Sequence, residues 1–158
     1  MSGASWSARL AELGIELPGV VPPVAAYVPA VHTGNHVYTS GQLPIRGGEL
    51  IKAGKVGAEV SAEEAKELAR VCGLNALAAV HALVGIDSVV KVVKVVGFVA
   101  SAPGFGGQPG VVNGASELFG EIFGDAGAHA RSAVGVAELP INAPVEVEII
   151  VEVTPGLA

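Results

Sequence analysis

The chain has little charge, few aromatic residues and almost no cysteine. Only 15% of its 158 residues are charged, 4% are aromatic, and there is a single cysteine. One cysteine excludes an intramolecular disulfide, and one cysteine with four histidines argues against a structural zinc site. The nine Lys and Arg residues are scattered along a chain of net charge −6, which argues against a nucleic-acid-binding surface.

The chain also lacks the long apolar segments of secreted and membrane proteins. The opening residues, MSGASWSARLAELGI, contain no apolar core long enough for a signal peptide. The longest β-like apolar run, 89–100, is interrupted by Lys91 and Lys94 and is too short to cross a bilayer. We therefore expect a soluble, cytoplasmic protein with no membrane contact.

What the chain has in abundance is apolar surface, since hydrophobic residues make up 51% of it. So few charges on so apolar a chain favour an oligomer in which subunits share apolar faces. The length fits one domain over residues 1–158. Within it, we expect residues 1–23 to form a short helix over 5–13 followed by a proline-rich connector.

The first half of the remaining sequence predicts a hairpin and a long helix. Two short strands, 27–33 and 36–40, flank Gly34-Asn35, a pair suited to a tight turn. Ser61 and Glu64 form a capping-box pattern at the start of an apolar stripe with helical spacing. This stripe, which includes Cys72 as a core residue, ends before Gly85.

The second half predicts a central strand, a second helix and an apolar hairpin. Residues 88–101 are β-branched and apolar on both faces, 111–123 have helical spacing, and 131–153 contain two strand patterns around Ile141-Asn142. The order β-β-(β)-α-β-α-β-β predicts an α+β fold with two main helices on one face of one sheet. The other face is then expected to meet another subunit.

Several common types of site are excluded by missing partners. The stretch GFGGQPG lacks the lysine of a P-loop and the setting of a dinucleotide-binding fold. No Gly-x-Ser-x-Gly motif occurs, and Ser40 has no evident His and Asp partners. His32 and His36 flank the predicted turn and could meet across it, but they supply too few ligands for a metal. We therefore expect no metal at this pair and no P-loop or dinucleotide cofactor site.

Arg131 is the most informative single residue. Alternate positions of its predicted strand are Ala133 and Gly135, which leave space for its guanidinium to hold a carboxylate bidentately. The alternative is an ion pair with a C-terminal glutamate, and the predicted hairpin would place Arg131 opposite about Glu152. In the same hairpin Glu146 would lie roughly 20 Å from Arg131, at ~3.3 Å per strand residue. These two side chains could then share a pocket only across subunits.

Motifs throughout residues 27–153 carry a resemblance to a known family. They read AYVPAV, VYTSGQLPI, VSAEEA, VVNGASELF, HARSAVGVAELP and VEVEIIVEV. With them the chain resembles the Rid family of reactive-intermediate deaminases, also called YjgF-like or RidA-like proteins and formerly endoribonuclease L-PSP. The resemblance implies a chorismate-mutase-like α+β fold, with one mixed sheet, assembled as a homotrimer with ligand pockets between subunits.

The same resemblance implies an activity and a set of site residues. The activity would be hydrolytic deamination of 2-aminoacrylate or related 2-imino acids to 2-oxo acids and ammonia, as in a 2-iminobutanoate/2-iminopropanoate deaminase. Arg131 would hold the carboxylate and Glu146 would lie near the reacting centre. The other pocket residues that the resemblance implies are Tyr27, Ser40, Gly41 and Asn113.

Two positions depart from the family pattern. Active members often have Cys or Thr where this chain has Ala133, and usually have proline where it has His129. These changes alter the pocket beside Arg131 and keep a second function open, a non-catalytic trimer that binds small carboxylates or other metabolites. A third, endoribonuclease activity, is disfavoured by the acidic charge and by the lack of a basic, aromatic groove.

Overall fold

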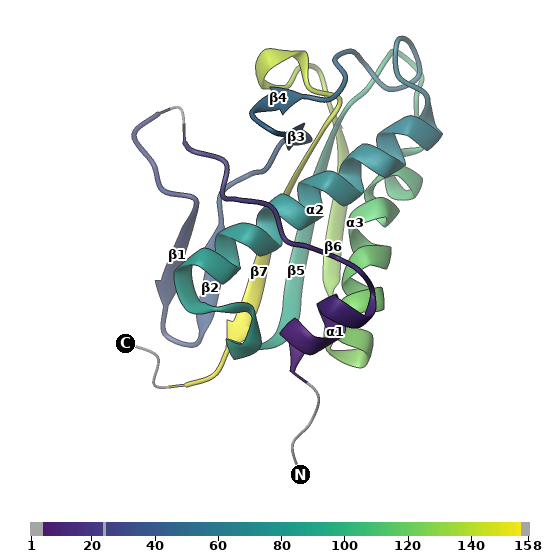
Figure 1. Cartoon of the computed structure of the whole chain (residues 1–158). Coiled ribbons are helices and arrows are strands. Elements are labelled where there is room, and N and C mark those ends of the chain that lie inside the picture. Colours follow the sequence, from purple (N-terminus) through teal and green to yellow (C-terminus); the bar gives the residue numbers. More distant parts are fainter. Residues whose placement is uncertain (1–4, 24, 156–158) are drawn as a thin grey trace.

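The fold is a mixed β-sheet with its helices on one face (Figure 1). The computed structural model describes residues 5–23 and 25–155. Its five-stranded sheet has the order β1 (Ala30–Thr33), β2 (His36–Thr39), β7 (Val145–Val153), β5 (Val89–Ala100) and β6 (Ala130–Val136). Only β5 and β6 run parallel. The predicted α+β class is therefore confirmed, with a small additional ladder of β3 (Ile45–Arg46) and β4 (Glu49–Leu50).

Two long helices cover the sheet, as the apolar periodicity predicts. They are α2 (Ala62–Val84) and α3 (Gln108–Phe123), and the short α1 (Trp6–Glu12) lies beside them (Figure 1). Helix α3 begins at Gln108, earlier than the predicted start at 111, because Pro109 suits the first helical turn, where no backbone N–H is required. Three short 3₁₀ turns, η1 (Ile86–Ser88), η2 (Gly124–Gly127) and η3 (Pro140–Asn142), connect the elements.

Helix α2 has the ends that its sequence predicts. The Ser61 hydroxyl accepts a hydrogen bond from the Glu64 N–H, and the Glu64 carboxylate accepts one from the Ser61 N–H. Gly85 ends the helix at a positive φ of 81°. The helix is long and apolar enough to cross a membrane, but most of its apolar surface is buried against the sheet and α3, and Cys72 is fully buried. It is therefore the core helix of this fold.

The first predicted hairpin is present but begins later than expected. Strand β1 starts at Ala30, not at Tyr27, because Pro29 has no N–H to donate to a ladder. The Pro29 carbonyl still accepts a hydrogen bond from the Ser40 N–H at 2.8 Å. His32 pairs with Val37 and His36 with Thr33, so the two histidines point to opposite faces and do not meet.

The predicted C-terminal hairpin is wrong, because β5 lies between β6 and β7. Val95 of β5 is level with Arg131 on one side and with Ile149 on the other. Helix α3 is the crossover that parallel pairing of β5 and β6 requires, and residues 137–144 then carry the chain to the other edge of β5. Arg131 is therefore not opposite Glu152, which pairs with Lys91 and His36.

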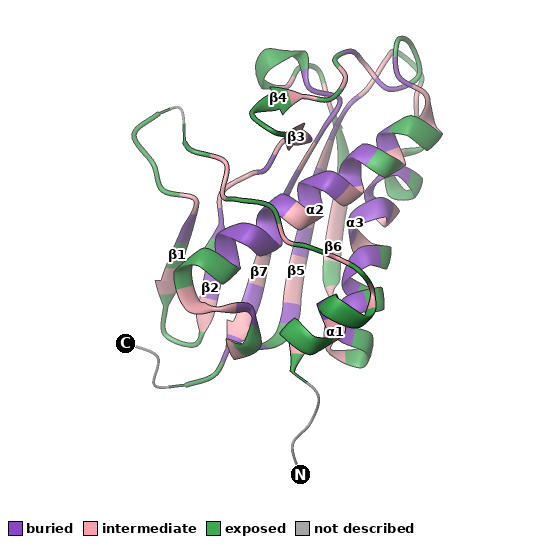
Figure 2. Ribbon diagram, viewed as in Figure 1, coloured by how far each residue is buried: buried purple, intermediate pink, exposed green. Residues whose placement is uncertain are grey.

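The two faces of the sheet differ in their covering. Buried residues line the facing sides of α2, α3 and the sheet (Figure 2). No helix of residues 5–23 and 25–155 covers the opposite face (Figure 1). There Val31, Tyr38 and Val134 remain 52%, 45% and 44% exposed. The covering of this face by another subunit remains a prediction.

Candidate functional site

Arg131 is held by polar atoms of α3. Its side chain, half-buried on β6, donates from Nη1 to Asn113 Oδ1 at 2.7 Å and to Ser116 Oγ at 3.2 Å. Asn113 and Ser116 are one helical turn apart, so both present their oxygen atoms to the same side of α3. The strand supplies the cation and the helix supplies two neutral acceptors.

The ion pair considered for Arg131 is not found. Within the described part of the chain, none of the ion pairs involves Arg131, and no hydrogen bond uses its Nε or Nη2. A guanidinium has five N–H donors, of which three belong to these two atoms. Together they form one straight edge, here called the Nε–Nη2 edge, which matches the two oxygens of a carboxylate.

A second group of predicted residues lines one cavity. Tyr27, Gly41 and Glu146 border a cavity of about 170 Å³ at the end of the sheet where β7 begins. A Cβ on Gly41 would lie 2.7 Å from Glu146 Cδ and 3.1 Å from Cγ. Glycine at this position therefore allows the Glu146 carboxylate to lie directly against the backbone.

The environment of Glu146 changes its acidity. Burial raises the pKa of this carboxyl, and the neighbouring charge of Glu148 raises it further. A carboxyl with a raised pKa holds a proton closer to neutral pH, and can then both accept and return a proton during a reaction. The position of Glu146 therefore suits acid–base chemistry.

Ser40 supports the cavity from outside. Its hydroxyl donates to the Val28 carbonyl at 2.6 Å, which fastens the segment carrying Tyr27 to the end of β2. Ser40 is not among the residues that border the cavity. The structure therefore brings together Tyr27, Gly41 and Glu146, with Ser40 behind them.

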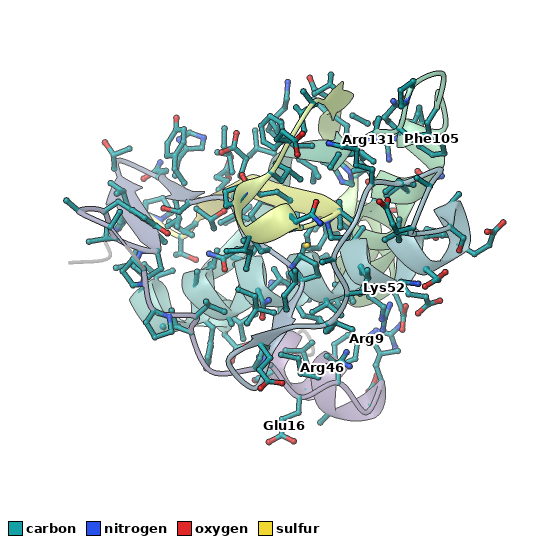
Figure 3. All side chains as sticks on the ribbon, turned by 90° about the horizontal axis from the view of Figure 1, so that it is seen from above. Arg9, Glu16, Arg46, Lys52, Phe105 and Arg131 are labelled. Atoms are coloured by element: carbon teal, nitrogen blue, oxygen red, sulfur yellow. The ribbon has the colours of Figure 1, made fainter. Side chains whose placement is uncertain are left out.

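Arg131 and Glu146 lie on opposite faces of the sheet. Arg131 reaches α3 on the helix-covered face, whereas Glu146 alternates with buried Val145 and Val147 and so points to the other face. Figure 3 shows Arg131 on the same side of the molecule as Phe105 and away from Arg46 and Glu16, whereas its separation from Glu146 follows from the alternation of side chains along β7. Asn113 lies beside Arg131, from which its side-chain oxygen accepts a hydrogen bond. One chain thus contains two separate halves of the predicted site.

The sequence did not indicate the apolar wall of the cavity. Most of it consists of Val21, Pro22, Pro29, Leu43, Ile45, Pro140 and Ile141, together with the buried Gln42. Ile141 is notable because its φ of 52° is costly for a β-branched residue. The only signal of this wall in the sequence was an isoleucine in a position that reads as a turn. Among residues 5–23 and 25–155, no three His, Cys, Asp or Glu side chains cluster to hold a metal ion.

Comparisons with known proteins assign the family. Residues 7–153 match the family described as "YjgF/chorismate_mutase-like, putative endoribonuclease". The Trypanosoma cruzi protein TCP17 is 42% identical over 148 residues, 92% of either chain. This chain therefore belongs to the YjgF/chorismate-mutase-like family, as its motifs predicted.

Two solved structures have the same fold. Atu1372 from Agrobacterium tumefaciens, a protein of unknown function, is 44% identical with a TM-score of 0.87, over 94% of this chain and 92% of that one. Escherichia coli TdcF, solved with bound serine, is 27% identical with a TM-score of 0.62, over 87% of this chain and 93% of that one. The architecture is thus shared across nearly the whole chain.

Proposed function

We propose that this protein is a hydrolase that deaminates 2-imino acids, and their enamine tautomers such as 2-aminoacrylate, to 2-oxo acids and ammonia. The observation that carries the proposal is the Nε–Nη2 edge of Arg131. Because Nη1 is held by two neutral acceptors, the charge of Arg131 is not neutralised by a carboxylate of the described chain. A small carboxylate is the ligand that this edge fits best. The serine bound to the relative TdcF is a molecule of this class.

The chemistry asks little of the protein beyond orientation and one proton-transfer group. The enamine first takes a proton on C3 to give the imine, whose protonated C=N is open to attack by water. The water oxygen bonds to C2, the C=N electron pair moves to nitrogen, and Glu146 accepts a proton from the water. Glu146 then returns this proton to the nitrogen, and the C2–N bond breaks with its electron pair on ammonia. The hydroxyl group gives its proton to the Glu146 carboxylate as C2=O forms, and Glu146 releases it to solvent.

The proposal requires two copies of the chain. Because Arg131 and Glu146 lie on opposite faces of one sheet, the carboxylate and the reacting carbon of one substrate need Arg131 from one subunit and Glu146 from a neighbour. The exposed apolar face with Val31, Tyr38 and Val134 is the surface that we expect to be buried in this assembly. The family resemblance favours a homotrimer with three such pockets.

Activity is tested with imines generated in place. A serine dehydratase supplies 2-aminoacrylate, and release of pyruvate is followed with and without the protein. We expect acceleration over buffer, and an Arg131→Lys variant should lose about 100-fold in kcat/KM because a point charge cannot replace the bidentate edge. Arg70→Lys is the matched control, since Arg70 pairs with Glu121 on the α2–α3 surface. No acceleration with several imines would refute the proposal.

Subunit sharing is tested by complementation. Arg131→Ala and Glu146→Gln chains are each inactive in this scheme, and they are unfolded together and refolded as a 1:1 mixture. Random assortment gives about a quarter of the sites an intact Arg131 and an intact Glu146 from different chains. Recovery of about a quarter of the wild-type activity supports a shared site. No recovery, with mixed oligomers present, places both residues in one chain and contradicts the scheme.

The family description also names endoribonuclease activity. A net charge of −6 disfavours RNA binding, because binding requires Lys and Arg to neutralise phosphates. RNA cleavage is measured on the same preparations as imine hydrolysis. Cleavage that survives purification and is lost in Glu146→Gln, without any imine turnover, would favour the ribonuclease over the deaminase.

A further inference from the structure

A chain of hydrogen bonds extends from Arg131 away from the Nε–Nη2 edge. Arg131 Nη1 reaches Ser116 Oγ at 3.2 Å, and Ser116 Oγ lies 2.8 Å from His129 Nε2. The other ring nitrogen, His129 Nδ1, lies 2.6 Å from the Gly127 carbonyl oxygen. Arg131 is thus connected through two side chains to the backbone between α3 and β6.

The donors and acceptors of this chain permit one consistent arrangement with a neutral ring. The Gly127 carbonyl can only accept, so His129 Nδ1 carries the hydrogen. Nε2 of the neutral imidazole is then an acceptor, and it takes the hydrogen of the Ser116 hydroxyl. The Ser116 oxygen in turn accepts from Arg131 Nη1. In this arrangement each hydrogen bond between Arg131 and the Gly127 carbonyl has one donor and one acceptor.

The far end of the chain is rigid. Gly127 is buried, and a Cβ there would lie 2.7 Å from the Phe119 carbonyl carbon, so η2 packs directly against the backbone of α3. The His129 ring meets the Phe119 ring edge to face, with centroids 6.1 Å apart and planes at 81°. Packing and backbone therefore both fix the imidazole.

We infer that His129 is a positioning residue, which acts through Ser116 to orient the Arg131 guanidinium. The inference rests on the proposed function, in which the Nε–Nη2 edge binds the substrate carboxylate. Arg131 Nη1 has two N–H groups. Asn113 accepts a hydrogen bond from one of them, and the Ser116 hydroxyl can accept from the other only if its own hydrogen points away from Arg131. His129 gives that hydrogen a fixed acceptor, so the plane of the guanidinium is set by two bonds instead of one.

The hydrogen-bond chain from Arg131 through Ser116 to His129, here called the relay, is tested without reference to activity. Nitrogen-15 NMR of the histidine ring distinguishes the two neutral tautomers and the charged form. We expect the ring hydrogen of His129 on Nδ1, and its Nε2 resonance to shift in Ser116→Ala while that of His32 stays in place. A hydrogen on Nε2, or a ring resonance that ignores Ser116→Ala, would overturn the inference.

The effect on the site is tested by a double-mutant cycle. His129→Ala and Ser116→Ala should each raise KM about fivefold to tenfold with kcat within about twofold, because an ill-held anchor weakens ground state and transition state alike. The double variant should be no worse than either single variant, since both remove the same unit. His129→Gln should keep most of the affinity, because its side-chain oxygen can accept from Ser116. The inference would be contradicted if the KM effects of the two single variants multiplied in the double variant. It would also be contradicted if His129→Gln had the same raised KM as His129→Ala.

Controls separate this inference from the proposed function. His32→Ala removes a half-buried histidine of β1 that has no part in the chain, and its KM should be unchanged. Pyruvate binding to the wild type is measured by calorimetry alongside turnover. If the wild type neither binds pyruvate nor hydrolyses imines, the proposed function fails while the NMR result still decides the relay. If the wild type is active and His129→Ala has an unchanged KM, the positioning role alone is refuted.

Discussion

The Glu146 carboxyl group and the Gly41 backbone occupy adjoining space, with Glu146 Cδ only 2.7 Å from where a Cβ on Gly41 would be. Gly41 follows the end of β2 and Glu146 is near the start of β7, the neighbouring strand. The close approach fixes the side of the cavity from which the carboxylate is presented. The glycine is therefore part of the way this carboxylate is positioned.

A Gly41→Ala substitution should displace the Glu146 side chain. The new methyl group would overlap the carboxylate, so we expect kcat for imine hydrolysis to fall about 100-fold, as for a misplaced catalytic group. The loss of unfolding free energy should be limited to about 1–2 kcal/mol, because a side chain can move where a backbone cannot. Gly106→Ala is the control, since nothing lies within 4 Å of its Cβ position and its φ is not positive. Full activity in Gly41→Ala would show that the position of Glu146 is unimportant.

The raised pKa of Glu146 should appear in the pH dependence of stability. A carboxyl that binds its proton more tightly in the folded state stabilises the fold fully below the unfolded pKa of about 4.3, and this contribution is lost as pH rises through the folded pKa. Glu146→Gln cannot ionise. Its unfolding free energy should therefore exceed that of the wild type by an amount that grows between about pH 4 and pH 7.

Urea unfolding of both proteins across this pH range measures the difference. Burial is the larger cause of the raised pKa and the charge of Glu148 is the smaller. Glu148→Gln should accordingly reduce the pH dependence without abolishing it. Parallel curves for Glu146→Gln and the wild type would mean that the pKa of Glu146 is the same in the folded and unfolded chains.

The sequence predicted those elements whose signals are local. The capping box of Ser61 and Glu64 located the start of α2, and the apolar residues on both faces of 89–100 identified β5 as a central strand. The pairing of 131–153 was predicted wrongly, since the residues around Ile141 indicate a reversal of the chain but not which edge of β5 the next strand joins.

For the site, motifs carried more information than strand geometry. They placed six residues in one pocket: Tyr27, Ser40, Gly41, Asn113, Arg131 and Glu146. Three of them, Tyr27, Gly41 and Glu146, border one cavity of this chain, whereas Arg131 and Asn113 lie together elsewhere. The contacts of His129 were not foreseen, because they depend on how η2 packs against α3. That packing is set by the tertiary approach of Gly127 to Phe119 and has no periodic signal.

Two glycines of α3 should respond to alanine with opposite signs. Gly120 is exposed with open space around its Cβ position, so Gly120→Ala should raise the unfolding free energy by about 1 kcal/mol through helix propensity. At Gly114 the Cβ would overlap the Lys66 carbonyl oxygen of α2 and lie 2.9 Å from its carbon. Gly114→Ala should cost about 2 kcal/mol or more by separating α2 from α3.

Urea denaturation of the two single variants and of the double variant tests this contrast. Each glycine serves as the control for the other, because the substitution and the helix are the same. Equal effects at both positions would mean that propensity alone decides them, and that α2 and α3 do not approach as closely as their backbones indicate.

We expect the Ile141 side chain to lower the stability of the fold and to contribute to ligand selection. Its backbone lies at φ 52° and ψ 26°, a left-handed conformation that costs an isoleucine roughly 1–2 kcal/mol, whereas asparagine tolerates it. The residue is 63% exposed and borders the cavity that Glu146 also borders, so its apolar surface is available to a ligand. Strain of this kind persists where the side chain has a use. Ile141→Asn should therefore raise the unfolding free energy by about 1 kcal/mol.

The same variant should lose preference for substrates with large apolar side chains. An apolar wall discriminates by roughly 1–3 kcal/mol per methylene group, so kcat/KM for the imine of leucine should fall about tenfold relative to that for the imine of alanine. Both imines are generated by an amino acid oxidase and followed by 2-oxo acid release. The variant could instead be more stable while the ratio of kcat/KM for the two imines stays unchanged. This result would show that Ile141 does not contact the substrate side chain and that its backbone strain has no role in substrate selection.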